Sequence, residues 1–77
     1  MAKKNHDIQI DTREIKADYQ GMQVEGIALS SGKKEIGKVL EISEKKFIVQ
    51  IPEESEQTVH SQNEGIEMII RFVNLHN

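Results

Sequence analysis

Three histidines are the side chains of this 77-residue chain best suited to bind a transition metal, because a neutral imidazole is a common ligand. They are His6, His60 and His76, so they lie far apart in sequence, and two of them are near the ends. None of the short His-to-His spacings that bring two imidazoles to one ion occurs, and there is no cysteine to supply a thiolate. We therefore expect solvated or capping histidines, no metal site and no disulfide.

The carboxylates are numerous, but their spacing does not suit acid–base catalysis. Asp7 and Asp11 share one face of a predicted strand, roughly 13 Å apart at about 3.3 Å per residue, which is too far to share a proton. Glu53, Glu54 and Glu56 form an acidic run that we expect to be solvated. No glycine-rich phosphate-binding motif is present. The sequence therefore predicts a protein that is not an enzyme and needs no cofactor.

A basic segment around the third and fourth predicted strands is the candidate for a nucleic-acid contact. Its lysines are Lys33, Lys34, Lys38, Lys45 and Lys46. A hairpin carrying them would be able to lie against phosphates. However, the segment has no arginine to read base edges, and the rest of the chain is acidic, with a net charge of −3 overall. We favour the simpler interpretation that these lysines protect sheet edges from aggregation.

Residues 61–76 predict one capped helix with an unusually wide apolar surface. Ser61 and Glu64 have the spacing of a capping box, and Gly65 is expected where the helix approaches the sheet closely. One stripe at core-facing spacing consists of Ile66, Ile69, Ile70 and Val73. A second stripe on the adjoining face consists of Met68, Phe72 and Leu75, bordered by Arg71. Because the first stripe alone would cover a small sheet, the second either packs in the core or contacts a partner.

Alternating apolar and polar residues predict strands before this helix. We expect them at residues 7–13, 22–29, 35–42 and 46–51. Gly26 lies where the alternation slips by one residue, which indicates a β-bulge. Pro52 ends the last strand, whose inward residues are Phe47, Val49 and Ile51. The order predicts an α+β fold, an antiparallel meander of three to four strands with one C-terminal helix packed across one face.

The length allows a single domain, which we place at residues 7–77, after a mobile N-terminal arm at residues 1–6. No apolar run approaches the roughly 20 residues that cross a bilayer, and no hydrophobic segment follows the basic start. We therefore expect a cytoplasmic protein that does not bind membranes.

Several short motifs resemble one known family. They are Lys3-Lys4, the segment at residues 32–39, Lys46-Phe47, and the closing Gly65-Ile66-Glu67 and Asn74-Leu75-His76. Together they resemble a family of small uncharacterised proteins from lactic acid bacteria and related low-GC Gram-positive bacteria. The resemblance implies a bacterial cytosolic domain of unknown function, and it transfers no catalytic residue.

Two functional hypotheses remain. The first is a non-enzymatic protein-interaction module that binds another protein, or itself, through Met68, Phe72, Leu75 and Arg71 on the outer face of the helix. The alternative is a nucleic-acid- or ribosome-associated module that uses the Lys33–Lys46 hairpin. They differ in salt dependence, because phosphate contacts weaken steeply with salt whereas an apolar helix contact does not.

Overall fold

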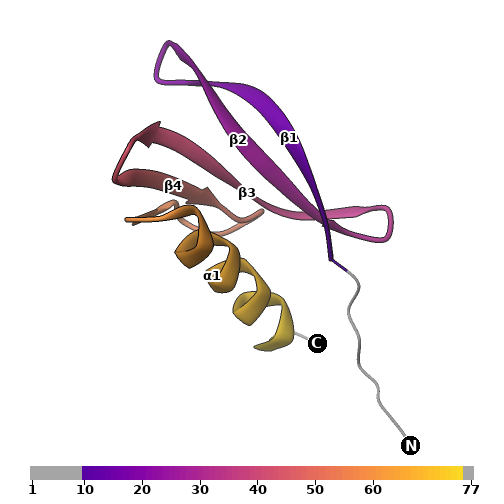
Figure 1. The fold of residues 1–77 in the computed structure, drawn as a ribbon. Helices are drawn as coiled ribbons and strands as arrows, with labels where there is room; N and C mark the ends of the chain where they lie inside the picture. The colour runs from indigo at the N-terminus through magenta and orange to yellow at the C-terminus, as the bar shows by residue number, and fades with distance from the viewer. Residues whose placement is uncertain (1–9, 76–77) are drawn as a thin grey trace, which may run out of the picture.

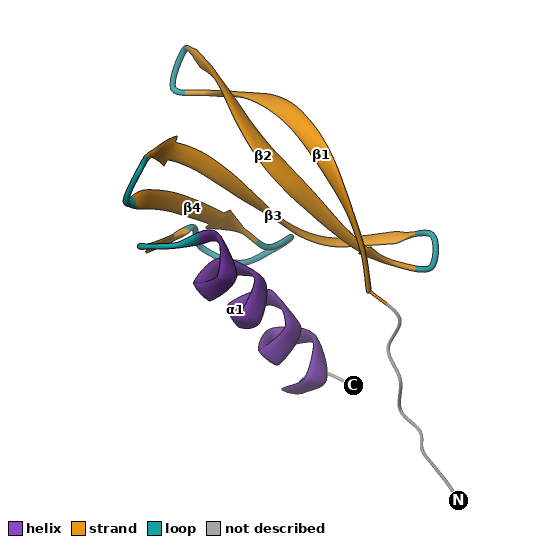
Figure 2. Cartoon of the chain, viewed as in Figure 1, coloured by secondary structure: helices purple, strands orange, loops and turns teal. Residues whose placement is uncertain are grey.

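A computed structural model describes residues 10–75 of the chain as a five-stranded antiparallel sheet with one helix packed on it (Figures 1 and 2). Its elements are β1 (Ile10–Tyr19), β2 (Met22–Ser31), β3 (Lys34–Ser43), β4 (Lys46–Gln50), β5 (Gln57–Val59) and α1 (Gln62–Leu75). The strand order is β1-β2-β3-β4-β5, so each strand pairs with its neighbour in sequence. The predicted α+β meander with a C-terminal helix is confirmed, with a short fifth strand added. The predicted arm at residues 1–6, with His6 and Asp7, lies outside the described residues, as does His76.

β1 extends beyond the end of the predicted strand at residue 13, because it continues to Tyr19 and pairs with β2 along its whole length. The two strands meet at Gln20 and Gly21, whose φ angles are 51° and 81°. Two consecutive positive φ angles are typical of the tight turn that matches the twist of a β-hairpin, and glycine adopts such an angle without steric cost.

The predicted bulge at Gly26 is wrong. Both ladders of β2 pass through Gly26 in register, with Ile15 on one side and Leu40 on the other. The alternation slips there because β2 buries different faces at its two ends: Val24 belongs to one apolar cluster, and Leu29 to another on the opposite side of the sheet. A change of buried face along a continuous strand and a bulge produce the same apolar pattern in the sequence.

The register shifts occur on β3 instead. Leu29 pairs with Gly37 whereas Ser30 pairs with Glu35, so Ile36 is the extra residue on β3. Strict alternation along β3 would put Ile36 and Leu40 on the same face, but the two belong to different clusters, since a bulge reverses the direction of the following side chains. A second shift, between Glu41 and Ser43, leaves Ile42 as an extra residue opposite β4.

Two glycines allow α1 to approach the sheet closely, as predicted for Gly65. A Cβ atom on Gly65 would lie 3.0 Å from both methyl carbons of Val39, and a Cβ on Gly37 would lie 2.8 Å from the Cδ1 atom of Ile69. Ile69 is fully buried in the main cluster, which also contains the predicted inward residues Phe47 and Val49 of β4, and Ile51, which follows the end of that strand. Gly65 of the helix therefore packs on Val39 of the sheet, and Ile69 of the helix packs on Gly37.

The structure packs Met68 and Phe72 of the second stripe of α1 against the core, which is one of the two alternatives for that stripe, and it corrects the assignment of Ile70 to the first stripe. Met68 and Phe72 are half-buried and pack against the main cluster, so they do not point away from the sheet. Ile70, assigned to the inner stripe, is half-buried and is not among the side chains packed on that cluster. The docked face is centred on Gly65 and Ile69, because a glycine can come closest to the sheet, and this rotates the helix away from the face that its isoleucines alone predict.

The predicted capping box is present in a shifted form. The backbone N–H of Glu64 donates to the Ser61 Oγ at 3.1 Å. The Glu64 carboxylate accepts from the backbone N–H of His60 at 2.8 Å, one residue before the N-cap. These bonds satisfy donors at the start of the helix and tie it to the end of β5.

The sheet face away from α1 is closed by a smaller cluster in which Val24, Leu40 and Ile48 are buried. Tyr19 packs against it, and its hydroxyl donates to Glu56 Oε1 at 3.1 Å, while Gln50 Nε2 donates to Glu56 Oε2 at 2.7 Å. Because β1 and β5 are opposite edges of the sheet, the contact of Tyr19 with the segment before β5 requires the sheet to curl. The carboxylate of Glu56 therefore connects the end of β1 to the end of β4 through these two hydrogen bonds.

Candidate functional site

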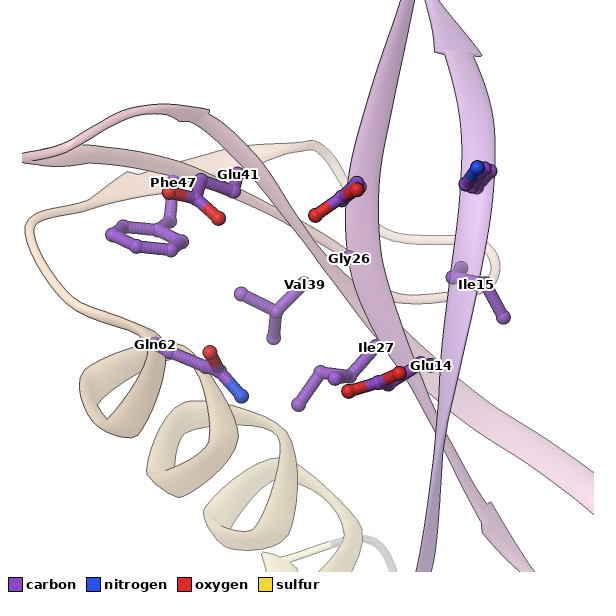
Figure 3. Close-up of a pocket in the computed structure, with 10 residues that line it drawn as sticks. Glu14, Ile15, Gly26, Ile27, Val39, Glu41, Phe47 and Gln62 are labelled. Atoms are coloured by element: carbon purple, nitrogen blue, oxygen red, sulfur yellow. The ribbon is translucent and has the colours of Figure 1, made fainter.

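A groove of about 410 Å³ lies between the β1–β2 hairpin and the start of α1 (Figure 3). Its floor is formed by Ile27, Val39 and Phe47, whose side chains lie in the space between the sheet and Gln62 of α1. The helix packs on β3, β4 and β5, whereas the hairpin extends past it, and this leaves the groove open (Figure 1). We refer to this site as the hairpin groove.

Charged side chains surround that apolar floor because of the strand register. Glu25 is directly opposite Glu41 in the β2–β3 ladder and opposite Lys16 in the β1–β2 ladder. Glu14 is opposite Ile27 on the same side of the sheet. All four charged residues line the groove, so three carboxylates are accompanied by a single lysine.

The pairing of Glu25 with Glu41 is unfavourable for folding. Directly opposed residues in an antiparallel pair have Cβ atoms about 4.5–5.5 Å apart, and like charges there are destabilising. Both glutamates are exposed, so water screens part of the repulsion. Figure 3 shows the Glu41 side chain beside Phe47 and that of Glu14 beside Ile27, so carboxylates border the apolar floor at two places.

None of these residues is predicted as a site from the sequence. The alternation of Glu25 and Glu41 with apolar neighbours indicated only solvent-facing positions on their strands. Their juxtaposition depends on the β2–β3 register, which is shifted by one residue at Ile36, and the neighbouring Gly37 was not interpreted as the mark of a bulge. A signal was nevertheless present, because Glu41 follows a stretch of β3, from Ile36 to Leu40, in which buried residues occur on both faces.

The lysines proposed for nucleic-acid contact do not form one surface. Lys33 and Lys34 lie at the β2–β3 turn and Lys45 and Lys46 at the β3–β4 turn, at opposite ends of β3 and so about 30 Å apart at about 3.3 Å per residue. Lys38, midway along, forms an ion pair with Glu35 at 3.7 Å.

The helix residues proposed for partner contact are also dispersed. Arg71 is exposed, Met68 and Phe72 pack inward, and the side chain of Leu75 lies outside the described part of the structure. Phe72 and Val73 line a second groove of about 440 Å³, which reaches Lys34 and Glu53 near the C-terminal end of the helix. It has the same balance of charge as the hairpin groove, since Glu35, Glu53 and Glu54 also line it, but Glu35 is paired with Lys38 and the other two glutamates lie in an exposed loop rather than opposite each other in a ladder.

Within residues 10–75, no three His, Asp or Glu side chains are close enough together to hold a metal ion. In the same range, the one helix is too short and too polar to span a membrane. In the hairpin groove, Glu14, Glu25 and Glu41 surround an apolar floor.

Comparison with known proteins places the chain in a family. No curated protein and no solved structure matches it. A family model described as "Protein of unknown function (DUF2969)" matches residues 1–76. This confirms the resemblance to a family without an assigned activity. Because the match covers nearly the whole sequence, the chain belongs to the DUF2969 family, a domain of unknown function.

Proposed function

We propose that this protein is a small, cytoplasmic, non-enzymatic protein-interaction module that holds a basic segment of a partner protein in the hairpin groove. The observation that carries the proposal is the direct opposition of Glu25 and Glu41 next to an apolar floor. A glutamate pair that weakens the sheet is expected where the carboxylates are needed for a ligand, because binding sites commonly sacrifice stability for function.

The chemistry of the groove selects the partner. Lysine and arginine side chains combine a cationic head with an apolar stem, so they complement carboxylates that border isoleucine, valine and phenylalanine. A nucleic acid would bring phosphates towards Glu14, Glu25 and Glu41, which is repulsive, and its favourable contacts would have to come from lysines at opposite ends of β3. We therefore favour a basic protein segment over the nucleic-acid alternative.

The groove also replaces the outer face of α1 as the main contact surface. Met68 and Phe72 contribute to the core of the domain, so their substitution would test stability before it tested binding. Arg71 remains exposed and is available to a partner that extends along the helix.

The proposal is tested with two synthetic peptides of equal length, one alternating lysine with leucine or phenylalanine, and one with glutamate in place of each lysine. Binding is followed by NMR titration of the labelled protein. We expect the basic peptide to shift backbone signals of Glu25, Ile27 and Glu41 and the acidic peptide to shift none of them. The variant Glu25→Gln/Glu41→Gln should bind the basic peptide about twofold to thirtyfold more weakly, because it removes two exposed charge pairs at roughly 0.2–1 kcal/mol each.

Glu44→Gln/Glu53→Gln is the matched control, because it removes the same charge from exposed residues that do not line the groove. It should retain the affinity of the parent. The thermal midpoint of the groove variant should equal or exceed that of the parent, since the opposed charges are gone. If both variants weakened binding of the basic peptide equally, the binding would depend only on the net charge of the protein, and a site in the groove would be refuted. Submicromolar RNA binding that is lost on exchanging Lys33, Lys34, Lys45 and Lys46 for glutamine would instead support the alternative.

A further inference from the structure

The outer edge of β1 is the longest uncovered edge of the described sheet. β1 spans 10 residues and β2 pairs with it from Ile10 to Tyr19, so in residues 10–75 no strand pairs with its other side. Such an edge presents a row of unpaired backbone N–H and C=O groups that can accept another strand. Proteins commonly keep edge strands short, bulged, interrupted by proline or charged. β1 is long, has no bulge and no proline, but it carries five charged residues, so charge determines which strand can pair with it.

Symmetry restricts how a second copy of β1 can pair with this edge. Two identical strands become antiparallel neighbours in one sheet through a two-fold axis perpendicular to the sheet, which keeps corresponding faces on the same side. The axis must then pass midway between one residue and the same residue of the partner. The strand allows four such centres that overlap most of its length, namely Arg13, Glu14, Ile15 and Lys16.

Charge distinguishes these four centres. A centre at Arg13, Glu14 or Lys16 places two identical charges directly opposite each other, which is destabilising. A centre at Ile15 pairs isoleucine with isoleucine and places Glu14 opposite Lys16 on both sides of the axis. In that register no like charges are opposed anywhere between residues 11 and 19.

We propose that a second copy of this chain pairs with β1 as an antiparallel edge strand, with the two-fold axis at Ile15 and with Glu14 opposite the partner's Lys16. Ile15 is half-buried and packs against the Val24, Leu40 and Ile48 cluster, so the isoleucine pair extends apolar packing on that face across the axis. On the other face, Glu14 and Lys16 stand at the rim of the hairpin groove, so the two grooves of the dimer lie side by side. Glu14 and Lys16 line the same groove, but Glu25 and Glu41 take no part in the pairing and self-association is measured without a ligand, so the proposal does not rest on the proposed function.

The test is a charge exchange at the paired positions, with the association constant measured by sedimentation equilibrium between about 1 μM and about 1 mM. Glu14→Lys faces the partner's Lys16 twice, and Lys16→Glu faces the partner's Glu14 twice. Each single variant should weaken dimerisation by at least about tenfold, since two attractive pairs become repulsive. Combining Glu14→Lys with Lys16→Glu restores both pairs and should return the affinity to within about threefold of the parent.

Asp18→Lys is the matched control, because Asp18 lies on the same strand and the same face as Glu14, is equally exposed, and undergoes the same change of charge. In the Ile15 register it faces the partner's Thr12, so its dimer should be as stable as that of the parent. A parent protein that stays monomeric throughout the concentration range would overturn the proposal. The proposal would also be overturned if Asp18→Lys weakened dimerisation as much as Glu14→Lys. A charge-exchanged double variant that did not recover the association constant of the parent would overturn it as well. Circular dichroism of each variant establishes that it is folded.

Discussion

The part of the sheet beneath α1 and the β1–β2 hairpin are held in place by different forces. Beneath the helix, Gly65, Gly37 and Ile69 bring two apolar surfaces into close contact, and Val39 and Val49 are almost completely buried. The outer half of the hairpin instead presents charged residues on the helix side of the sheet and is secured on the other side by partly buried residues and by Tyr19. The tightest packing is therefore in the region beneath the helix, whereas the exposed edge and the acidic groove both belong to the β1–β2 hairpin.

The largest expected effect separates two adjacent isoleucines of α1. Ile69→Ala should lower the free energy of unfolding by about 2–5 kcal/mol, because Ile69 is fully buried and its removal leaves a cavity over Gly37. Ile70→Ala is the matched control and should cost less than about 1 kcal/mol, since Ile70 is only half-buried. Urea denaturation measures both. Equal losses would contradict the orientation of the helix described above.

A smaller effect is expected where the hairpin joins the rest of the sheet. A Cβ atom on Gly26 would lie 2.9 Å from the Leu40 Cδ2 atom and even closer to the carbonyl oxygen of Val39. Gly26→Ala should therefore cost about 1–3 kcal/mol, because β2 must move away from β3. Hydrogen exchange of the variant should rise in β1 and β2 more than in α1. A uniform rise through all elements would mean that the hairpin does not open separately from the helix-covered region.

The smallest effect concerns the hydroxyl of Tyr19. Desolvation, together with the hydrogen bond to Glu56 and the negative charge of its carboxylate, raises the pKa of Tyr19 above its ordinary value of 10.0. A raised pKa means that this contribution to stability is fully present below the pKa of the unfolded chain and is lost as the pH rises through that of the folded protein. Tyr19 is the chain's one tyrosine and there is no tryptophan, so ultraviolet absorbance of the phenolate follows this group alone.

Glu56→Gln should bring the pKa of Tyr19 back towards 10.0, since it removes the charge and leaves a weaker acceptor. Glu54→Gln, a nearby carboxylate in the same segment, is the control and should leave the titration of Tyr19 unchanged. An unaltered titration in Glu56→Gln would show that this contact does not close the sheet in solution.

Local patterns were sufficient to predict the fold. The capping residues Ser61 and Glu64, the inward residues of β4 and the close approach at Gly65 follow from short-range spacing, and the structure contains all of them. The hairpin groove did not follow, because the opposition of Glu25 and Glu41 is set by the β2–β3 register. The extension of β1 through residues 14–19 was missed for a related reason. Its apolar side chains alternate, but the cluster that they contact is formed by β2, β3 and β4.

The strand order also determines how the chain folds. Every strand pairs with the one next to it in sequence, so nearly all of the sheet forms by closing short loops, which costs little chain entropy. Folding rates rise as contacting residues lie closer in sequence, and we therefore expect rapid, hairpin-by-hairpin assembly. The hydrogen bond between Tyr19 and Glu56 spans 37 residues and needs both β1 and β4 in place, so it belongs to the final step. Its loss should accelerate unfolding while leaving the folding rate almost unchanged.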